Sequence, residues 1–254
     1  MRNYIYDGTI AGFFSLVFKI FEDKVENFKI SKKNSINIKL GVENIFVDTN
    51  IDDSIRVIKK IRNDFSKYSL KNIEGAFYSE IEGCEYEIIN YIKEGLKYKK
   101  NIDNHLEITS VSKVYKMSEK CYKEAHKIKG LVRFKEIIDG SLFSNINSTS
   151  NVLILIAPHF MARFPNEKWA IYDTKRKNAI IHINKKIEYI ENFEINIDIV
   201  NEKIISEEEN IYSKLWKNYF NNISIPEREN KKLQMKFVPK KYWNFLNEME
   251  EYDG

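Results

Sequence analysis

The order of apolar and polar residues predicts short strands and amphipathic helices. Near the N-terminus, Tyr4-Ile-Tyr6 has the composition of a strand, Asp7-Gly8 is a turn signal, and Thr9 is suited to cap a helix. The apolar residues of that helix recur at steps of three and four, on one face: Ile10, Phe13, Phe14, Val17, Phe18 and Phe21. We interpret this aromatic stripe as part of the core.

The part of the chain up to residue 104 is predicted to be mainly helical. A strand is indicated by the alternation with polar residues of Ile36, Ile38, Leu40 and Val42. Three helices follow, at roughly 52–65, 70–79 and 85–98. Gly83 separates the last two. This part contains no recognisable catalytic motif.

The best-defined element is a long helix, predicted over about 106–129. Small and apolar residues form a seam along it: Val111, Val114, Ser118, Cys121, Ala125 and Ile128. A second face carries Lys113, Lys116, Lys120, Lys123 and Lys127. We expect Gly130 to end the helix in a left-handed cap. Residues 131–137 then read as a strand, with Arg133 two residues beyond its start.

The remaining sequence predicts a further helix, several strands and two C-terminal helices. We expect Asn151 to cap a helix over 152–162 that Pro158 bends or restarts. An antiparallel meander is predicted from strands at 169–173, 179–183 and 193–200. Ser206 opens one later helix and Pro239 another. The predicted fold class is α+β, with helices packed on one antiparallel sheet in a single domain of residues 1–254, divided into parts 1–104 and 105–254.

The composition is that of a globular protein with a small excess of positive charge. Hydrophobic residues make up 43% of 254 residues, and 41 Lys and Arg against 37 Asp and Glu give a net charge of +4. This balance excludes a histone-like polycation but permits a local anion-binding patch. No secretory segment is recognisable, and the longest apolar run, 152–157, is too short to span a membrane. We therefore expect a reduced, soluble, cytoplasmic protein.

Several kinds of chemistry are excluded because their motifs are missing. Cys84 and Cys121 are isolated, so we expect no structural zinc or iron–sulfur site. The sequence has no glycine-rich phosphate loop, no Gly-x-Ser-x-Gly elbow and no zinc-deaminase signature. We therefore predict neither a metal nor a bound cofactor.

Two stretches form a matched pair, 124–134 and 157–165, each with a histidine a few residues before an arginine. They contribute His126, Lys129, Arg133, His159 and Arg163. Imidazoles set among fixed cations suit phosphate contacts or proton transfer, although a lone histidine is usually structural. Asp173, with Arg176 nearby, either orients one of these histidines or serves as a turn residue.

Two further basic clusters are candidates for the same surface. The lysine face of the long helix either follows phosphates or is simply solvated. The second cluster lies near the C-terminus, at Arg228, Lys231, Lys232, Lys236, Lys240 and Lys241. The aromatic residues among these cations either stack on unpaired bases or belong to the core: Phe237, Tyr242 and Trp243.

Segments spread over most of the chain resemble a bacterial family labelled "probable DNA metabolism protein". They are Tyr6-Asp-Gly-Thr9, Gly12-Phe13, Glu124-Ala-His126, Lys129-Gly130, Arg133-Phe134, Ala157-Pro-His-Phe160, Arg163-Phe-Pro165, Trp169 to Asp173 with Arg176, Arg228-Glu-Asn-Lys231, Leu233-Gln234 and Pro239 to Trp243. Members occur beside a radical-SAM protein assigned to DNA repair, and some are fused to a uracil-DNA-glycosylase-like domain. The resemblance implies work on damaged or modified nucleic acid and supplies no catalytic residue. We expect any such glycosylase partner of this chain to be a separate polypeptide.

Three functional hypotheses follow. The first is a nucleic-acid-binding accessory factor of a DNA repair or modification system, acting with a radical-SAM or glycosylase partner. Its binding surface would contain His126, Lys129, Arg133, His159, Arg163, Asp173, Arg176, Arg228, Lys231 and Lys240. The second is an enzyme that acts on a nucleotide or nucleic-acid phosphate with a histidine as acid or base. The third is a protein-binding adaptor whose basic clusters dock an acidic partner.

Overall fold

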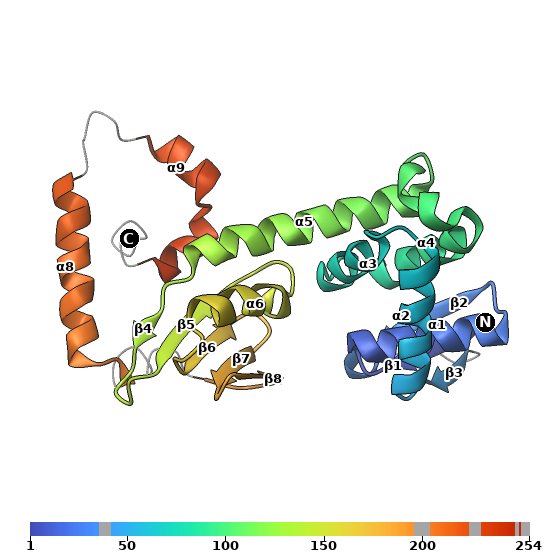
Figure 1. Cartoon of the computed structure of the whole chain (residues 1–254), viewed down its shortest axis with the longest axis horizontal. Coiled ribbons are helices and arrows are strands. Elements are labelled where there is room, and N and C mark those ends of the chain that lie inside the picture. Colours follow the sequence, from blue (N-terminus) through green and yellow to red (C-terminus); the bar gives the residue numbers. More distant parts are fainter. Residues whose placement is uncertain (36–41, 196–203, 224–229, 247–248, 250–254) are drawn as a thin grey trace. The chain divides into compact units, whose positions relative to one another are not determined.

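The computed structural model describes residues 1–35, 42–195, 204–223, 230–246 and 249 (Figure 1). The chain divides into two compact units, Met1–Tyr122 (unit 1) and Lys123–Gly254 (unit 2), and the boundary falls inside one helix. That residues 1–254 form a single domain with parts 1–104 and 105–254 stays a prediction, which separate expression of the two units would test.

Unit 1 contains a three-stranded parallel sheet. In spatial order its strands are β2 (Phe28–Lys32), β1 (Arg2–Tyr6) and β3 (Glu43–Phe46). Parallel strands need a crossover connection, which α1 (Ile10–Asp23) supplies between β1 and β2. The strand predicted at Tyr4–Tyr6 is confirmed as part of β1. Its pairing with β2 and β3 in a parallel sheet was not predicted, because local patterns do not reveal which strands pair.

The helices of unit 1 agree with the prediction. Besides α1 they are α2 (Ile51–Asp64), α3 (Ser69–Tyr78) and α4 (Cys84–Tyr98), with 3-10 helices η1 (Lys33–Ser35) and η2 (Lys99–Asn104). The Thr9 cap is confirmed, since its hydroxyl accepts a hydrogen bond from the Gly12 N–H at 2.9 Å. Phe13, Phe14 and Val17 are buried, as a core stripe requires. Of the predicted strand around 36–42, residues 36–41 lie outside the described residues.

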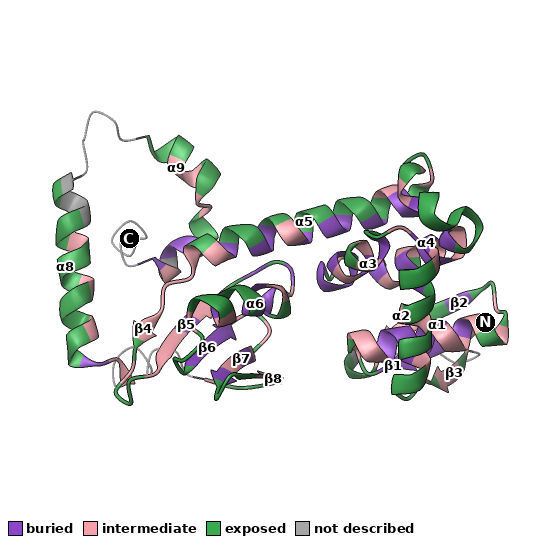
Figure 2. Ribbon diagram, viewed as in Figure 1, coloured by how far each residue is buried: buried purple, intermediate pink, exposed green. Residues whose placement is uncertain are grey.

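The long helix is α5 (Thr109–Leu131), which begins in unit 1 and ends in unit 2. Its predicted seam is confirmed, because all of the seam residues are buried, and Figure 2 shows buried and exposed positions alternating along the helix. The predicted helix end was wrong. The Val132 N–H donates to the Ile128 carbonyl at 2.9 Å, so helical bonding continues past Gly130. Arg133 therefore lies in a short connection before β4 (Lys135–Glu136) and not within a strand.

Unit 2 holds a five-stranded mixed sheet in the order β4-β5-β6-β7-β8. After β4 the strands are β5 (Leu142–Ile146), β6 (Trp169–Asp173), β7 (Asn178–Ile183) and β8 (Lys186–Ile190). β5 and β6 pair in parallel because the helix α6 (Leu153–Arg163) connects them, while the other neighbours pair antiparallel. The α+β class is confirmed, and the two sheets, one parallel and one mixed, correct the expectation of one antiparallel sheet.

The meander prediction is correct for β6 and β7 but not for the strand that follows. Asn184 and Lys185 both have positive φ, which suits a two-residue hairpin turn. The chain therefore returns at once as β8. Of the strand predicted at 193–200, residues 193–195 are not in a strand and 196–200 lie outside the described residues.

The helix α6 also differs from its prediction. It begins at Leu153 after Val152, which has a helical conformation, so Asn151 is not its cap. Pro158 lies inside the helix without ending it. Proline cannot donate to the Ile154 carbonyl, and both residues are exposed, where water can satisfy that oxygen.

The C-terminal part contains α8 (Glu207–Ile223), α9 (Lys231–Phe237) and the 3-10 helix η5 (Lys240–Phe245). The Ser206 start signal is confirmed, because its hydroxyl accepts from the Glu209 N–H at 3.1 Å. The helix expected after Pro239 is the short η5. Every residue of α8 whose burial is described is exposed or half-buried, as Figure 2 shows.

The core of unit 2 lies among the sheet, α6 and the end of α5. It includes Ala125, Ile128, Ile146, Leu153, Ile156, Phe160, Trp169, Ile171, Ile180 and Tyr242. Within the described part of the chain, no helix is long and apolar enough to cross a membrane.

Candidate functional site

A buried carboxylate on α5 holds the loop 148–150, which connects β5 to α6. Glu124 accepts hydrogen bonds from the Thr149 N–H at 2.8 Å and from the Ser150 N–H at 2.9 Å. Its Oε1 atom also accepts from the Nζ of Lys241 at 2.8 Å. One side chain thus joins three segments that are far apart in the sequence.

The charge of Glu124 is stabilised by this environment. Burial opposes ionisation, but hydrogen bonds from Lys241 and from the N–H groups of Thr149 and Ser150 outweigh it and lower the pKa of Glu124 to about 2. The buried Tyr242 hydroxyl donates a further hydrogen bond to Oε1 at 3.0 Å. Glu124 is therefore ionised at neutral pH and acts as a fixed acceptor.

A second buried acid supports the same loop through an arginine. Asp173 is fully buried, and its Oδ2 lies 2.7 Å from a guanidinium nitrogen of Arg176. The guanidinium donates to the carbonyls of Ser148 at 3.0 Å and Thr149 at 2.6 Å. The Lys175 N–H donates to Oδ1 of Asp173 at 3.0 Å, so Asp173 also acts as a turn residue. These two predicted site residues are brought together as an anchor for the loop.

Exposed cations surround Thr149. The Nζ of Lys175 lies 3.3 Å from its carbonyl oxygen, and the Nζ of Lys241 lies 2.8 Å from its hydroxyl. Thr149 and both lysines are exposed, whereas the acids beneath them are buried. The exposed Lys127 follows Glu124 by three residues on the same side of α5. We call Thr149, Lys175, Arg176 and Lys241 the Thr149 cluster. With Lys127 on the neighbouring helix, it is a candidate site for an anion.

The first histidine–arginine stretch lies at the end of α5. His126 is exposed and Lys129 half-buried, and both are helical. Arg133 donates to the Gly130 carbonyl at 2.9 Å, which satisfies one of the last carbonyls of the helix. Arg133 therefore helps to stabilise the end of α5, whether or not it also binds a ligand.

The second stretch lies on α6. His159 is exposed, and its ring centroid is 5.0 Å from that of Phe160. Arg163 is exposed, with its guanidinium carbon 5.6 Å from the centroid of Phe164. α5 and α6 share the core of unit 2, so both stretches are carried by one packed body.

The predicted C-terminal cluster is only partly described. Arg228 lies outside the described residues, and Lys231 and Lys240 are exposed. Tyr242 and Trp243 are buried, and the indole N–H of Trp243 donates to the Val238 carbonyl at 2.8 Å. Of the two alternatives for these rings, the core interpretation is therefore confirmed, and base stacking is excluded because the rings are buried. The physical reason is that η5 turns these rings into the core while the lysines face solvent.

A groove of about 590 Å³ lies between α8 and the segment that follows α5. It is lined by Arg133, Phe134, Glu209, Tyr212, Ser213, Leu215, Trp216 and Tyr219. Neither His126 nor His159 is among these lining residues. An enzyme that used these histidines with the arginines would gather them in one pocket. This groove does not do so. Sequence reasoning missed it, because a helical pattern does not tell whether an aromatic face stays exposed.

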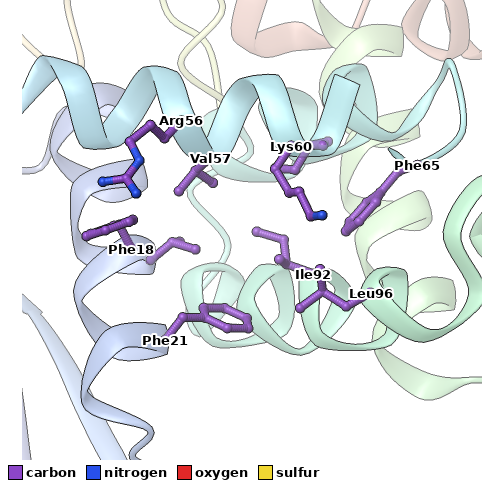
Figure 3. A pocket seen from close by; sticks show the side chains of 10 residues that line it. Phe18, Phe21, Arg56, Val57, Lys60, Phe65, Ile92 and Leu96 are labelled. Atoms are coloured by element: carbon purple, nitrogen blue, oxygen red, sulfur yellow. The ribbon is translucent and has the colours of Figure 1, made fainter. Parts of the chain in front are cut away.

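A smaller pocket, of about 220 Å³, lies among α1, α2 and α4 in unit 1 (Figure 3). Its walls are almost entirely apolar, and Arg56 and Lys60 extend from α2 beside it. Lys60 pairs with Asp64 at 2.6 Å, and Arg56 pairs with Asp53 at 3.5 Å. Since both cations have acidic partners on their own helix, this pocket offers mainly apolar contacts.

A polar pocket of about 370 Å³ lies beside β2. Within it, Glu85 pairs with Lys32 at 3.3 Å and accepts from the Tyr6 hydroxyl at 3.1 Å. Burial raises the pKa of the Cys84 thiol, so Cys84 is a poor nucleophile. Among the described residues, no group of three or more His, Cys, Asp or Glu side chains is placed to hold a metal ion.

The fold class is α+β, and the Thr149 cluster is a candidate anion-binding surface on unit 2. A family model described as a domain of unknown function, DUF4130, matches residues 82–248. This match covers more than half of the chain, so the protein belongs to the DUF4130 family. It includes all of unit 2 up to residue 248 and only the end of unit 1. A search among curated proteins finds no match.

Proposed function

We propose that this protein is a nucleic-acid-binding accessory factor of a DNA repair or modification system. The observation that supports the proposal best is that Lys175, Arg176 and Lys241 all donate hydrogen bonds to the exposed Thr149. Buried Glu124 and Asp173 fix the loop and its neighbours. The cations are therefore ordered before a ligand arrives, which reduces the entropy lost on binding.

The expected ligand group is a phosphodiester. Lysine ammonium groups contact phosphates as point charges and carry no sequence information. The resemblance to the "probable DNA metabolism protein" family supports nucleic acid as the polyanion. It also supports a radical-SAM or glycosylase-like protein as the partner that performs the chemistry. A cytoplasmic location is part of this proposal.

The test is fluorescence-anisotropy binding of labelled single- and double-stranded DNA over a salt series. Each phosphate contact contributes about −0.7 to −0.9 to the slope of log affinity against log salt. A Lys127→Ala, Lys175→Ala variant is expected to bind more weakly, with a slope shallower by about 1.4 to 1.8.

The matched control removes two exposed lysines of unit 1, Lys29 and Lys59, and so makes the same change in net charge. This control is expected to bind like the wild type. An undetectable or salt-insensitive interaction of the wild type, or equal losses in both variants, contradicts the proposal.

The other hypotheses make different predictions in the same experiment. An adaptor prefers an acidic partner protein over DNA at equal ionic strength. An enzyme loses turnover but not affinity when His126 or His159 is replaced by alanine.

A further inference from the structure

The helix α8 leaves a row of aromatic rings in solvent. The exposed fractions are 68% for Tyr212, 45% for Trp216 and 54% for Tyr219. These residues follow one another at steps of four and three, so they share one face of the helix. The rings of Trp216 and Tyr219 are tilted by 36°, with centroids 5.9 Å apart. Exposed aromatic faces in a row are unusual, since such rings are normally part of a core.

The opposite wall of the groove carries positive charge. Arg133 lines this wall, and its guanidinium donates a hydrogen bond to the Gly130 carbonyl. This bond holds the Arg133 side chain beside the end of α5. Lys129 and Lys135 lie in the same short segment, which contains no acidic residue between them. A ligand in the groove thus meets the aromatic rings of α8 on one side and Arg133 on the other.

The two walls are joined by hydrogen bonds at the start of α8. Glu209 accepts from the Glu136 N–H at 3.3 Å through one oxygen and from the Ser213 hydroxyl at 3.2 Å through the other. The Ser206 N–H donates to the Glu136 carbonyl at 3.0 Å. These bonds tie α8 to β4, so the groove belongs to the folded unit 2.

We infer that this groove binds unpaired bases of a single-stranded nucleic acid. Bases stack on aromatic side chains without sequence preference, and an adjacent arginine contributes cation–π and phosphate contacts. The volume of about 590 Å³ lies within the range of small-ligand sites. The inference rests on the proposed function and adds the form of the ligand, a strand with exposed bases.

The combination of aromatic rings with Arg133 favours nucleic acid over an apolar protein helix as the occupant. A helix docked on α8 would be held mainly by Ile211 and Leu215, which are also exposed. It would make no use of Arg133, which lines the groove. A strand uses both walls, because its bases stack on the rings and a phosphate can contact Arg133.

The experiment compares two oligonucleotides of equal length and charge, oligo(dT) and an abasic strand of the same number of phosphates. The wild-type protein is compared with Trp216→Ala and with Leu215→Ala. The second variant removes an apolar side chain of the same groove that is not aromatic and so cannot stack on a base. Affinity is measured by anisotropy. Tryptophan fluorescence supplies a second signal, since Trp169 and Trp243 are buried and Trp216 is exposed.

The wild type is expected to bind oligo(dT) about 5- to 150-fold more tightly than the abasic strand, as expected for the loss of one stacking contact. Trp216→Ala should lose this preference while keeping its affinity for the abasic strand. Leu215→Ala should keep most of the preference for oligo(dT) over the abasic strand. Quenching of Trp216 by oligo(dT) but not by the abasic strand is the expected spectroscopic result.

Equal binding of both strands by the wild type overturns the inference and leaves the proposed function in place. Binding of neither strand overturns the proposed function and the inference together. If Trp216→Ala keeps the preference for oligo(dT), the inference is wrong. If both variants also change the sedimentation coefficient of the protein, alone or with a protein partner, α8 is a protein-docking helix.

Discussion

Replacing Glu124 by glutamine should destabilise unit 2 in a pH-dependent manner. The carboxylate accepts four hydrogen bonds, from the N–H groups of Thr149 and Ser150, the Nζ of Lys241 and the hydroxyl of Tyr242. Glutamine has one acceptor oxygen and presents an NH₂ group where the other oxygen stood. One loop N–H therefore loses its acceptor, and Lys241 loses its ionic partner.

The magnitude follows from the pKa of Glu124. A carboxyl group with an ordinary value of 4.5 and a folded-state pKa of about 2 stabilises the folded protein by about 3 kcal/mol at neutral pH. Lys241 is partly exposed, so solvent screens its share, and about 2 kcal/mol is the expected loss. Because the folded pKa is the lower one, this stabilisation is complete above pH 4.5 and disappears as the pH falls towards 2.

The assay is urea unfolding followed by tryptophan fluorescence, which reports on unit 2 because Trp169, Trp216 and Trp243 all lie there. Wild type and Glu124→Gln are compared at several pH values. Their difference in unfolding free energy should be constant from pH 7 to 5 and should shrink below pH 4. The exposed Glu119→Gln of the same helix is the control, expected within about 0.5 kcal/mol of wild type. A difference that does not vary with pH, or one below about 0.5 kcal/mol at pH 7, refutes the reasoning.

Four further predictions concern stability and reactivity. Asp173→Asn breaks a buried ion pair and should cost about 3–5 kcal/mol in the same unfolding assay, so a neutral result would contradict the anchoring role. Gly75→Ala should lower the melting temperature, because a Cβ there would meet the backbone and hydroxyl of Ser118, and overpacking costs about 1–3 kcal/mol. Gly130→Ala should instead gain up to about 1 kcal/mol, since that helical position has open space. Cys84 should resist a thiol reagent in the folded protein and react on unfolding, as mass spectrometry would show, because its thiol is buried and its pKa is raised.

The candidate site could be predicted only in part. The sequence pointed to Asp173 and Arg176 as neighbours, since they stand three residues apart, but not to their burial beneath Thr149. Lys241 was predicted as a member of a basic cluster. Its bond to Glu124 could not be predicted, because the two residues are 117 positions apart in the sequence. The aromatic surface was sought at Tyr242 and Trp243 and is found on α8, because burial depends on how a helix packs.

The sequence by itself determined the local structure. The seam of α5 and the Thr9 and Ser206 caps follow from contacts within four residues, and the strands β6 and β7 follow from short apolar runs, so neighbouring residues decide them. Only the tertiary structure decided that β5 and β6 pair in parallel, that Gly130 does not end α5, and that Glu124 meets the loop 148–150. These outcomes depend on contacts between distant segments, which are selected by the packing of the whole core and leave no periodic signal in the chain.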